Sequence, residues 1–329
     1  MIQKITIQNF RCFKKLAATD LTRFNVLVGR NGSGKTAFLE ALFIGNGSLE
    51  PLLRIRNQRL GQELVLLNSD ERGAIEPLVH QLFHQFNTKN QIQITTFGPR
   101  ANTSAKLTTN DNTLRYEFQP RQSSKFQTTT MRIGNDGELK IPPPPPNLKK
   151  VSFYPASIKH NPREVSQRFS ELSKRTESEK FITGLKPVLP DLEDLSIELE
   201  SGTPMVFAKM KGLDERIPMQ YVSDGIYRLL SILMGISSAS DGYVLIDELE
   251  NGIYHRNFPE IVELIYNFSI TFDVQIFVTT HSKELLQAIA DVSRNHEAEY
   301  CLQRIEKGEN EQFNGITFRS AIEQEIEIR

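Results

Sequence analysis

The feature that most constrains the fold of this chain is an octapeptide, residues 29–36 (GRNGSGKT), which matches the pattern GxxxxGK[ST] at every fixed position. An apolar run, residues 24–28, comes directly before the octapeptide. Directly after it, apolar residues recur at helical spacing: Ala37, Phe38, Ala41 and Leu42. The order strand, glycine-rich loop and helix is the setting that this motif requires, so we predict a phosphate-binding loop.

The residue types in this loop suit the phosphates of a nucleotide. Glycines let backbone N–H groups wrap an anion, and the helix amino terminus adds a favourable dipole. The Lys35 ammonium would neutralise charge on the β and γ phosphates, and the Thr36 hydroxyl would hold Mg²⁺. The other residues expected to contact the phosphates are Asn31, Gly32, Ser33 and Gly34.

An acidic pair follows a second apolar run, residues 243–246 (YVLI). Asp247 and Glu248 stand where a buried strand would emerge at the phosphate edge of a parallel sheet. We expect Asp247 to bind Mg²⁺ and Glu248 to orient and polarise the attacking water. Such a run by itself is commonly a strand that ends in a solvated turn, but the phosphate loop upstream favours the catalytic interpretation.

A third segment, residues 221–228 (YVSDGIYR), opens a predicted helix whose Ile226, Leu229, Leu230 and Leu233 form an apolar stripe. Ser223 suits the N-cap position, and Gly225 would leave the first-turn amides accessible to an anion. Taken alone, the segment also fits an ordinarily capped core helix. Its position about 20 residues before Asp247 is what makes it a candidate site.

Composition limits the class of protein. The chain has 329 residues, 39% of them hydrophobic, and a formal charge of -1, so no global excess of positive charge indicates nucleic acid or a membrane surface. Cys12 and Cys301 show no metal-ligand spacing, which argues against a disulfide framework or a zinc site. We find no signal-peptide pattern and no apolar stretch near the roughly 20 residues that span a bilayer. These observations predict a cytoplasmic protein without a membrane segment.

Strands alternate with helices at both ends of the chain. Residues 2–8, 206–211, 243–246 and 274–279 read as strands, and 225–238, 259–268 and 283–290 as helices, which predicts an α/β fold with a mostly parallel sheet covered on both faces. The middle is rich in Gln, Asn, Thr and Ser, with prolines at 142–146. We therefore predict a core of residues 1–48 and 205–329, interrupted by an inserted region, 49–204. Strands are expected there at 91–97 and 114–118, and a helix at 162–175.

Taken together, these motifs resemble the ABC-type ATPase heads of the SMC, RecF and OLD proteins, which are P-loop NTPases with a mixed sheet. Residues 7–13 (IQNFRCF) look like the amino-terminal strand and loop of those heads, and 279–282 (TTHS) follows a strand as in the family. Residues 247–255 (DELENGIYH) are similar to the DEPExGLHP run of the OLD-like group, although Leu249 and Arg256 stand where the family usually has proline. The resemblance is strongest to stand-alone ATP-binding proteins of prokaryotic anti-phage defence systems.

The resemblance implies a role for each matching residue. Ser223 and Gly225 would contact the γ-phosphate of ATP held by a second subunit, so that two ATP molecules lie in a head-to-tail homodimer or a higher oligomer. His281 would be the switch histidine near the γ-phosphate, and Arg11 would lie near the nucleotide. Glu250 and Asn251 would fall in the loop that crosses the dimer interface. The glutamine of the Q-loop stays unassigned, although residues 151–156 approach its expected place.

The middle segment separates this chain from several relatives. It has no heptad repeats, which excludes a coiled-coil cohesin-like protein, and only about 48 residues follow His281, so no Toprim nuclease domain is expected. Transporter subunits usually carry LSGGQ where this chain has residues 222–226 (VSDGI). We therefore expect an ATP hydrolase that regulates a separately encoded nuclease or toxin in phage defence.

Two other functions stay open. One is a nucleotide-gated scaffold with negligible turnover, and the other is a RecF-like ATPase of DNA repair, which would bind duplex DNA. Short basic clusters offer a local surface for nucleic acid but are more often solvated surface: Arg54, Arg56, Arg59, Lys149 and Lys150. The sequence identifies neither the trigger nor the partner.

Overall fold

The computed structural model describes residues 1–47, 79–99, 102–110, 113–120, 125–133, 139–140, 148–156, 161–306 and 311–314. The chain divides into two compact units, residues 1–149 with 301–329, and residues 150–300. The boundaries between these units, at 149/150 and 300/301, differ from those predicted for the core and the inserted region, at 48/49 and 204/205. The predicted boundaries stay a proposal. The predicted proline run and the arginines at 54, 56 and 59 lie outside the described residues.

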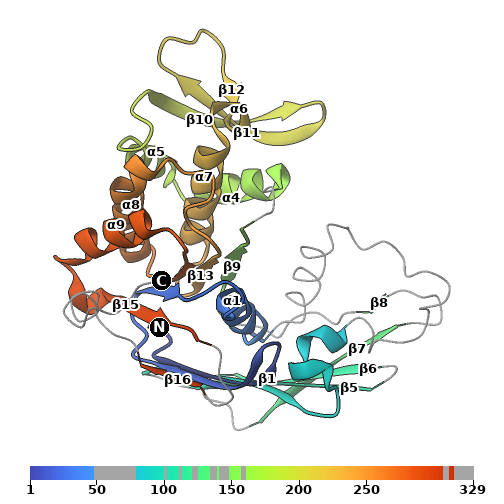
Figure 1. Cartoon of the computed structure of the whole chain (residues 1–329). Coiled ribbons are helices and arrows are strands. Elements are labelled where there is room, and N and C mark those ends of the chain that lie inside the picture. The colour runs from blue at the N-terminus through green and yellow to red at the C-terminus, as the bar shows by residue number, and fades with distance from the viewer. Residues whose placement is uncertain are drawn as a thin grey trace. The chain divides into compact units, whose positions relative to one another are not determined.

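The first unit is built on a long sheet in the order β16-β2-β1-β4-β5-β6-β7-β8 (Figure 1). Neighbouring strands are antiparallel except β16 and β2, which are parallel. Its strands are β1 (Lys4–Phe10), β2 (Phe13–Thr19), β4 (Ile92–Phe97), β5 (Thr103–Asn110), β6 (Thr113–Gln119), β7 (Gln127–Ile133), β8 (Leu139–Lys140) and β16 (Glu311–Asn314). The period-2 pattern predicted the first strand correctly, because Ile5 and Ile7 are both fully buried.

One face of this sheet supports the helix that follows the phosphate loop. Helix α1 (Lys35–Ile44) is anchored at its carboxyl end by Tyr116 of β6, whose hydroxyl donates to the Ile44 carbonyl at 2.8 Å and accepts from the Gly47 amide at 3.0 Å. Strand β3 (Phe24–Val28) is fully buried and lies beside β15 (Tyr300–Arg304). Two single turns, η2 (His80–Leu82) and η3 (His84–Phe86), precede β4.

The second unit contains three parallel strands, β9 (Val151–Tyr154), β13 (Tyr243–Ile246) and β14 (Gln275–Thr279). The middle strand, β13, pairs with both neighbours in register, so that Tyr154, Ile246 and Val278 lie side by side. The carboxyl ends of all three strands therefore meet at one edge, which is where parallel sheets present polar side chains. The predicted strands at 243–246 and 274–279 are confirmed.

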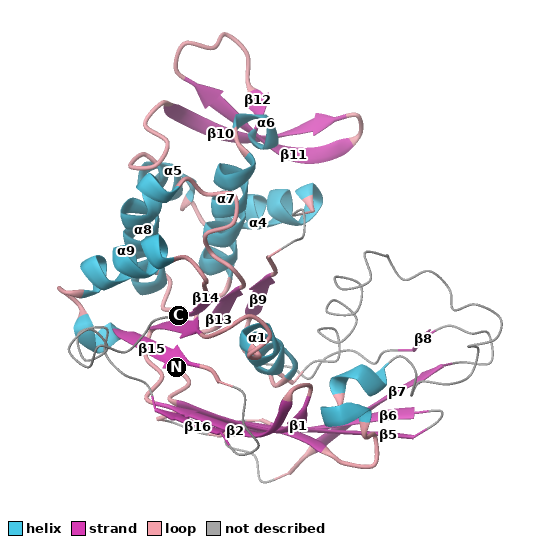
Figure 2. Cartoon of the chain, in the orientation of Figure 1, coloured by secondary structure: helices cyan, strands magenta, loops and turns pink. Residues whose placement is uncertain are grey.

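The α-helices of this unit lie above these strands in the view of Figure 2. Helix α4 (Pro162–Lys174) buries Phe169 and Leu172, as its sequence predicts, and the Asn161 side chain caps it by accepting from the Arg163 amide. The remaining helices are α5 (Ser178–Leu185), α6 (Met219–Val222), α7 (Asp224–Ser238), η4 (His255–Asn257), α8 (Phe258–Thr271), α9 (Lys283–Ser293) and η5 (Glu297–Glu299). The α/β class with mixed strand directions is thus confirmed.

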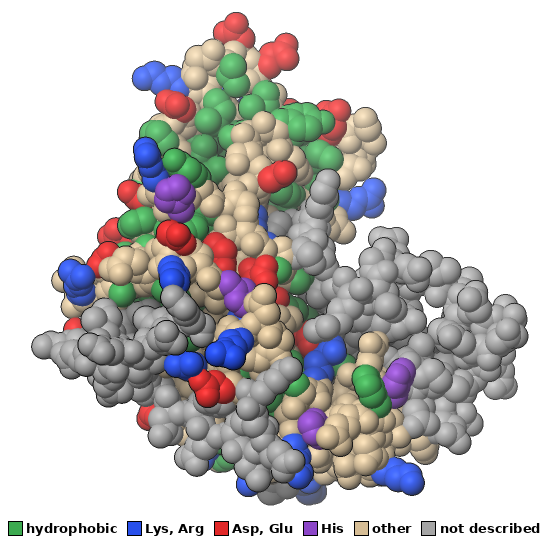
Figure 3. All heavy atoms as spheres, in the orientation of Figure 1, with side chains coloured by type: hydrophobic (Ala, Val, Ile, Leu, Met, Phe, Trp, Pro, Cys, Tyr) green, Lys and Arg blue, Asp and Glu red, His purple; other side chains and the backbone are tan. Residues whose placement is uncertain are grey.

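A small antiparallel sheet belongs to the same unit. It consists of β10 (Leu192–Glu200), β11 (Thr203–Met210) and β12 (Ile217–Pro218). Hydrophobic side chains gather over it at the top of the space-filling view (Figure 3). The burial of the leucines decreases along β10: Leu195 is buried, whereas Leu199 is 73% exposed.

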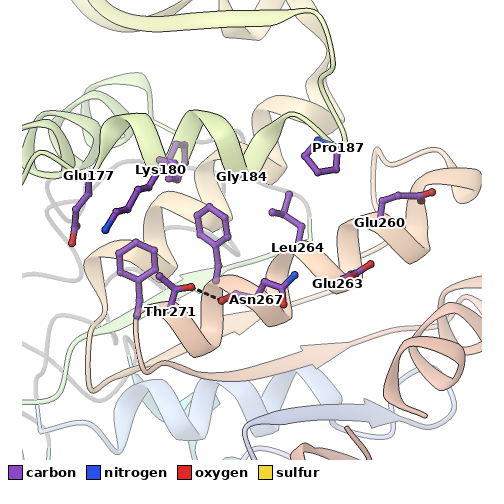
Figure 4. Close-up of a pocket in the computed structure, with 12 residues that line it drawn as sticks. Glu177, Lys180, Gly184, Pro187, Glu260, Glu263, Leu264, Asn267 and Thr271 are labelled. Atoms are coloured by element: carbon purple, nitrogen blue, oxygen red, sulfur yellow. Dashed lines mark hydrogen bonds between the residues drawn. The ribbon is translucent and has the colours of Figure 1, made fainter. Parts of the chain in front are cut away.

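A groove lies between α5 and α8 in this unit (Figure 4). Its volume is about 600 Å³. Phe181 and Phe268 both line it and meet edge to face, with ring centroids 5.5 Å apart. Gly184 is required here, because a Cβ on it would lie 2.8 Å from the Phe268 ring. Among the described residues, no helix has the length and apolar character that crossing a membrane requires.

Candidate functional site

The phosphate loop adopts backbone angles that its glycines permit. Gly29, Gly32 and Gly34 have φ values of 144°, 71° and 112°, which other residues rarely adopt. The Lys35 side chain is buried, and its ammonium donates to the Gly29 carbonyl at 2.8 Å and to the Arg30 carbonyl at 3.2 Å. This ammonium therefore lies over the loop, where the β and γ phosphates of a nucleotide are held in this motif.

The loop also contains a hydroxyl that suits a phosphate ligand. The Ser33 side chain is only 4% exposed, and its Oγ has no hydrogen-bond partner among the described residues. A buried hydroxyl without a partner carries a desolvation cost that a phosphate oxygen would remove. The residues present therefore fit a nucleotide.

The loop between β1 and β2 packs against the same glycines. A Cβ on Gly34 would lie 2.7 Å from Cys12 Sγ and 2.6 Å from the Phe13 ring, so this position has room only for glycine. Arg11 has a positive φ of 49°, and its guanidinium forms a salt bridge with Glu40 of α1. The predicted nucleotide contact of Arg11 stays a proposal, but Arg11 is tied to the helix that begins in the phosphate loop.

The acidic edge of the second unit begins with Asp247, which directly follows β13. This side chain is 6% exposed, and its Oδ1 accepts a hydrogen bond from the Thr279 hydroxyl at 2.6 Å. The same hydroxyl accepts from the Glu248 amide at 2.8 Å. Thr279 therefore fixes both acidic residues relative to the neighbouring strand β14.

One oxygen of the Glu248 carboxylate accepts a hydrogen bond, and the other faces a histidine. Its Oε2 accepts from the Asn251 side-chain amide at 2.8 Å, and its Oε1 lies 3.8 Å from Nε2 of His281. The side chains of Glu248 and His281 are both 36% exposed, so each can reach a ligand. The backbone of Glu248 has a φ of 49°, a strained value for a residue with a side chain, and such strain is concentrated at functional sites.

His281 is positioned by its backbone as well. Glu250 Oε1 accepts from the His281 amide at 2.7 Å and from the Ser282 amide at 3.1 Å, at the start of α9. Ser282 caps this helix by accepting from the Leu285 amide. The Glu250 carboxylate thus connects the loop 247–251 to His281 through hydrogen bonds.

Arg228 is a buried cation that organises the same edge. Its guanidinium donates to the carbonyl oxygens of Asp247 and Glu248 at 2.7 and 3.0 Å, and to those of Pro155 and Ala156 at 3.3 and 3.1 Å. Burial lowers the pKa of Arg228 from its ordinary value, and the nearby acidic groups, Asp247 first, partly offset this shift. Helix α7 is therefore bonded to the segments that follow β9 and β13.

The start of α7 differs in detail from its prediction. Ser223 occupies the N-cap position with extended backbone angles, but its exposed side chain makes no capping hydrogen bond among the described residues. Gly225 is buried rather than open, and a Cβ on it would lie 1.9 Å from the Gly252 carbonyl oxygen. Glycine is needed here because the turn at 250–253 approaches the helix closely.

Each unit thus brings part of the predicted site together. The phosphate loop and Arg11 lie in the first unit, and Ser223, Gly225, Asp247, Glu248 and His281 lie in the second. Sequence reasoning quoted Thr279 and Arg228 within their motifs but assigned neither a role. Thr279 is the last residue of β14, the strand beside β13, and Arg228 is the only basic residue of the largely buried helix α7, so both carry a signal in the sequence.

Comparison with known proteins agrees with this geometry. Residues 24–287 match the family described as "AAA domain, putative AbiEii toxin, Type IV TA system". The chain is similar to an "ATP/GTP phosphatase" of Helicobacter pylori, with 23% identity covering 92% of this chain and 93% of that protein. It is also similar to the "OLD nuclease" of Thermus scotoductus, with 34% identity over 97 residues, which are 30% of this chain and 17% of that protein.

The fold is that of an SMC head. A crystal structure of the "SmcHead bound to the C-winged helix domain of ScpA" matches with a TM-score of 0.59 and 14% identity, covering 97% of this chain and 99% of that chain. The phosphate loop, the acidic pair that follows β13 and these matches all agree with an ABC-type ATPase. The similarities to an OLD nuclease and to an SMC head support the SMC, RecF and OLD group of ABC-type ATPases. The chain belongs to the AAA-domain family that its residues 24–287 match.

Proposed function

We propose that this chain hydrolyses ATP to ADP and phosphate, with Glu248 as the general base. The observation that carries the proposal is the held carboxylate of Glu248, which Asn251 fixes at 2.8 Å and which faces His281 at 3.8 Å. A carboxylate held in a fixed orientation can accept the proton of an attacking water. The similarity to a protein named as an ATP/GTP phosphatase supports the same reaction.

The mechanism follows from the chain's own residues. Glu248 takes a proton from water, whose oxygen forms a bond to the γ phosphorus while the bond to the β-γ bridging oxygen breaks. Lys35 and the loop amides stabilise charge on the phosphates, and His281 would donate to a γ-phosphate oxygen. Thr36 and Asp247 would hold Mg²⁺, which supplies charge neutralisation to the phosphates when it is bound.

Steady-state phosphate release tests this proposal. Glu248→Gln should lower kcat by at least about 100-fold, because general-base catalysis contributes that much. Lys35→Ala should lower it by at least about 100-fold as well, because it removes a cation that stabilises charge on the phosphates. Glu260→Gln, an exposed carboxylate of α8, is the matched control and should keep the wild-type rate. A wild-type rate no higher than that of Glu248→Gln would favour a nucleotide-gated scaffold instead.

We further propose that two chains close head to tail around ATP in the cytosol, and that this state controls a separately encoded effector in anti-phage defence. Support comes from the exposed Ser223 at the start of α7 and from the family description, which names a putative toxin of a Type IV system. A plaque assay in cells that carry this gene with its chromosomal neighbours tests the role. Protection should be lost with Lys35→Ala, and protection that survives Lys35→Ala would contradict it.

Contact with nucleic acid stays a separate candidate. A RecF-like role predicts ATP-dependent binding of duplex DNA that weakens steeply with salt, because phosphate contacts release counterions. No binding to duplex DNA at low salt would remove this candidate without affecting ATP hydrolysis.

A further inference from the structure

A second cavity in the first unit touches the phosphate loop. It has a volume of about 460 Å³ and is lined by Gly29, Arg30, Asn31, Ser33, Arg304, Ile305 and Glu306. The last three residues come from the end of β15 and directly after it. None of them belongs to the motif, so the sequence pattern assigns this wall of the cavity no role.

The end of β15 is fixed tightly to the start of the loop. The Ile305 amide donates to the Val28 carbonyl at 2.8 Å. A Cβ on Gly29 would lie 2.2 Å from the Ile305 carbonyl oxygen, so only glycine permits this approach. These backbone contacts of Ile305 therefore fix the chain at Arg304 beside the loop, and the Arg304 side chain lines the cavity from there.

The charges in the cavity favour an anion. The lining residues include two arginines, Arg30 and Arg304, and a single acidic residue, Glu306. The Arg304 Nε lies 2.7 Å from Glu306 Oε1, and the two side chains are 35% and 60% exposed. A pair this exposed is weak, so Arg304 can exchange Glu306 for a ligand oxygen at little cost. Phosphate oxygens suit the planar guanidinium because they accept two parallel hydrogen bonds.

The position of Lys35 indicates which phosphate reaches the cavity. The Lys35 ammonium donates to the carbonyl oxygens of Gly29 and Arg30, and both residues line the cavity. In this motif the lysine contacts the β and γ phosphates. The cavity therefore adjoins the γ end of a bound triphosphate rather than its base.

We propose that Arg304 binds the γ-phosphate of ATP, and that this contact makes the phosphate loop prefer a triphosphate over a diphosphate. The inference rests on the proposed function, because it assumes that ATP occupies the loop. On binding, the Arg304 guanidinium leaves Glu306 and pairs with a γ-phosphate oxygen, and no covalent bond changes. ADP lacks that oxygen, so its affinity does not depend on Arg304.

Equilibrium binding of fluorescent ADP and of a non-hydrolysable ATP analogue, both with Mg²⁺, tests the proposal on the full chain. Arg304→Gln should lower the affinity for the ATP analogue by about tenfold, which corresponds to about 1.4 kcal/mol in binding free energy. The affinity for ADP should stay within about twofold of the wild-type value. Arg294→Gln is the matched control, because Arg294 also pairs with one carboxylate, that of Asp291 at 2.8 Å, but directly follows α9, away from the cavity lining. Equal weakening of both nucleotides, or of neither, would overturn the inference.

A second variant keeps the test independent of any folding defect. Glu306→Gln removes the carboxylate that competes for Arg304, so the affinity for the analogue should rise by about twofold to fivefold, while that for ADP stays unchanged. A fall in analogue affinity in this variant would also contradict the inference. If the wild-type chain bound neither nucleotide, the proposed function itself would fail, and that outcome differs from a loss of preference alone.

Discussion

Oε1 of Glu248 lies 3.8 Å from Nε2 of His281, beyond hydrogen-bond distance, while Asn251 donates to the other carboxylate oxygen at 2.8 Å. One oxygen of the proposed base is therefore fixed, and the other faces a histidine without bonding to it. Both groups keep hydrogen-bonding capacity for a water and a phosphate. Asn251 additionally donates to the Ala156 carbonyl at 3.3 Å, so it connects the base to the end of β9.

Asn251 should act as a positioning residue for Glu248. We expect Asn251→Ala to lower kcat by about 10- to 100-fold, because a base displaced by about 1 Å loses that much rate, and to leave the KM for ATP within about twofold. Asn267→Ala on α8 is the control and should change neither constant. A change in KM alone would mean that Asn251 serves nucleotide binding rather than the base.

Arg228 should contribute to stability as well as to the site. Arg228→Met removes the guanidinium from four carbonyl oxygens, two of which, those of Glu248 and Ala156, still accept from Asn251. The loss of these charge-assisted bonds outweighs the relief of a buried charge, so we expect a loss of about 2–4 kcal/mol in the free energy of unfolding. Arg228→Lys should lose less stability than Arg228→Met, because an ammonium can still donate to one pair of carbonyls, although it cannot bridge both pairs as the guanidinium does. Urea unfolding measures both variants, with the exposed Arg175→Met as control. A loss below about 0.5 kcal/mol in Arg228→Met would contradict this role.

Gly225 and Ser223 should respond differently to alanine. Gly225→Ala places a Cβ 1.9 Å from the Gly252 carbonyl, so the turn at 250–253 must move and hydrolysis should fall steeply. Ser223→Ala removes a hydroxyl that makes no capping bond among the described residues, so stability should change by less than about 0.5 kcal/mol. Phosphate release and thermal melting separate the two variants. A large melting shift in Ser223→Ala would show that its hydroxyl is structural.

The two cysteines should differ in reactivity towards a thiol reagent. Burial raises the pKa of Cys301 to about 12, so almost none of it is thiolate at pH 8, whereas Cys12 is exposed. We expect one thiol to react in the native chain and two in denaturant. Because Cys12 Sγ packs at Gly34, ATP at ten times its Kd should slow the native reaction about tenfold. An unchanged rate with ATP would contradict the placement of the nucleotide at this loop, and Cys12→Ser, which should not react natively, is the control.

Much of the fold is predictable because its signals are local. The strand at 24–28, the helix after Gly34 and the strand at 243–246 each follow from the periodicity of a few residues. Helices α8 and α9 end at 271 and 293, three residues later than predicted, because neither glycine nor proline stops them earlier. The long antiparallel sheet was not predicted, since pairing partners such as β1 and β4 lie far apart in the sequence.

The site was predictable to the extent that its chemistry lies in short motifs. Lys35, Asp247 and Glu248 come from such motifs. The bonds from Thr279 to Asp247 and from Arg228 to four carbonyls depend on which strands are neighbours, so the pattern of one segment does not contain them. Arg304 is a further example, because only the packing of β15 against Gly29 places it beside the phosphate loop.

The solution mass of Glu248→Gln, measured with and without Mg-ATP, shows whether two chains share the nucleotide site, because blocking hydrolysis should trap any dimer that closes around ATP. We expect one subunit without nucleotide and two with Mg-ATP, and we expect this shift to be lost when Ser223→Ala is added. A mass that is the same with and without Mg-ATP would contradict a site shared between two subunits.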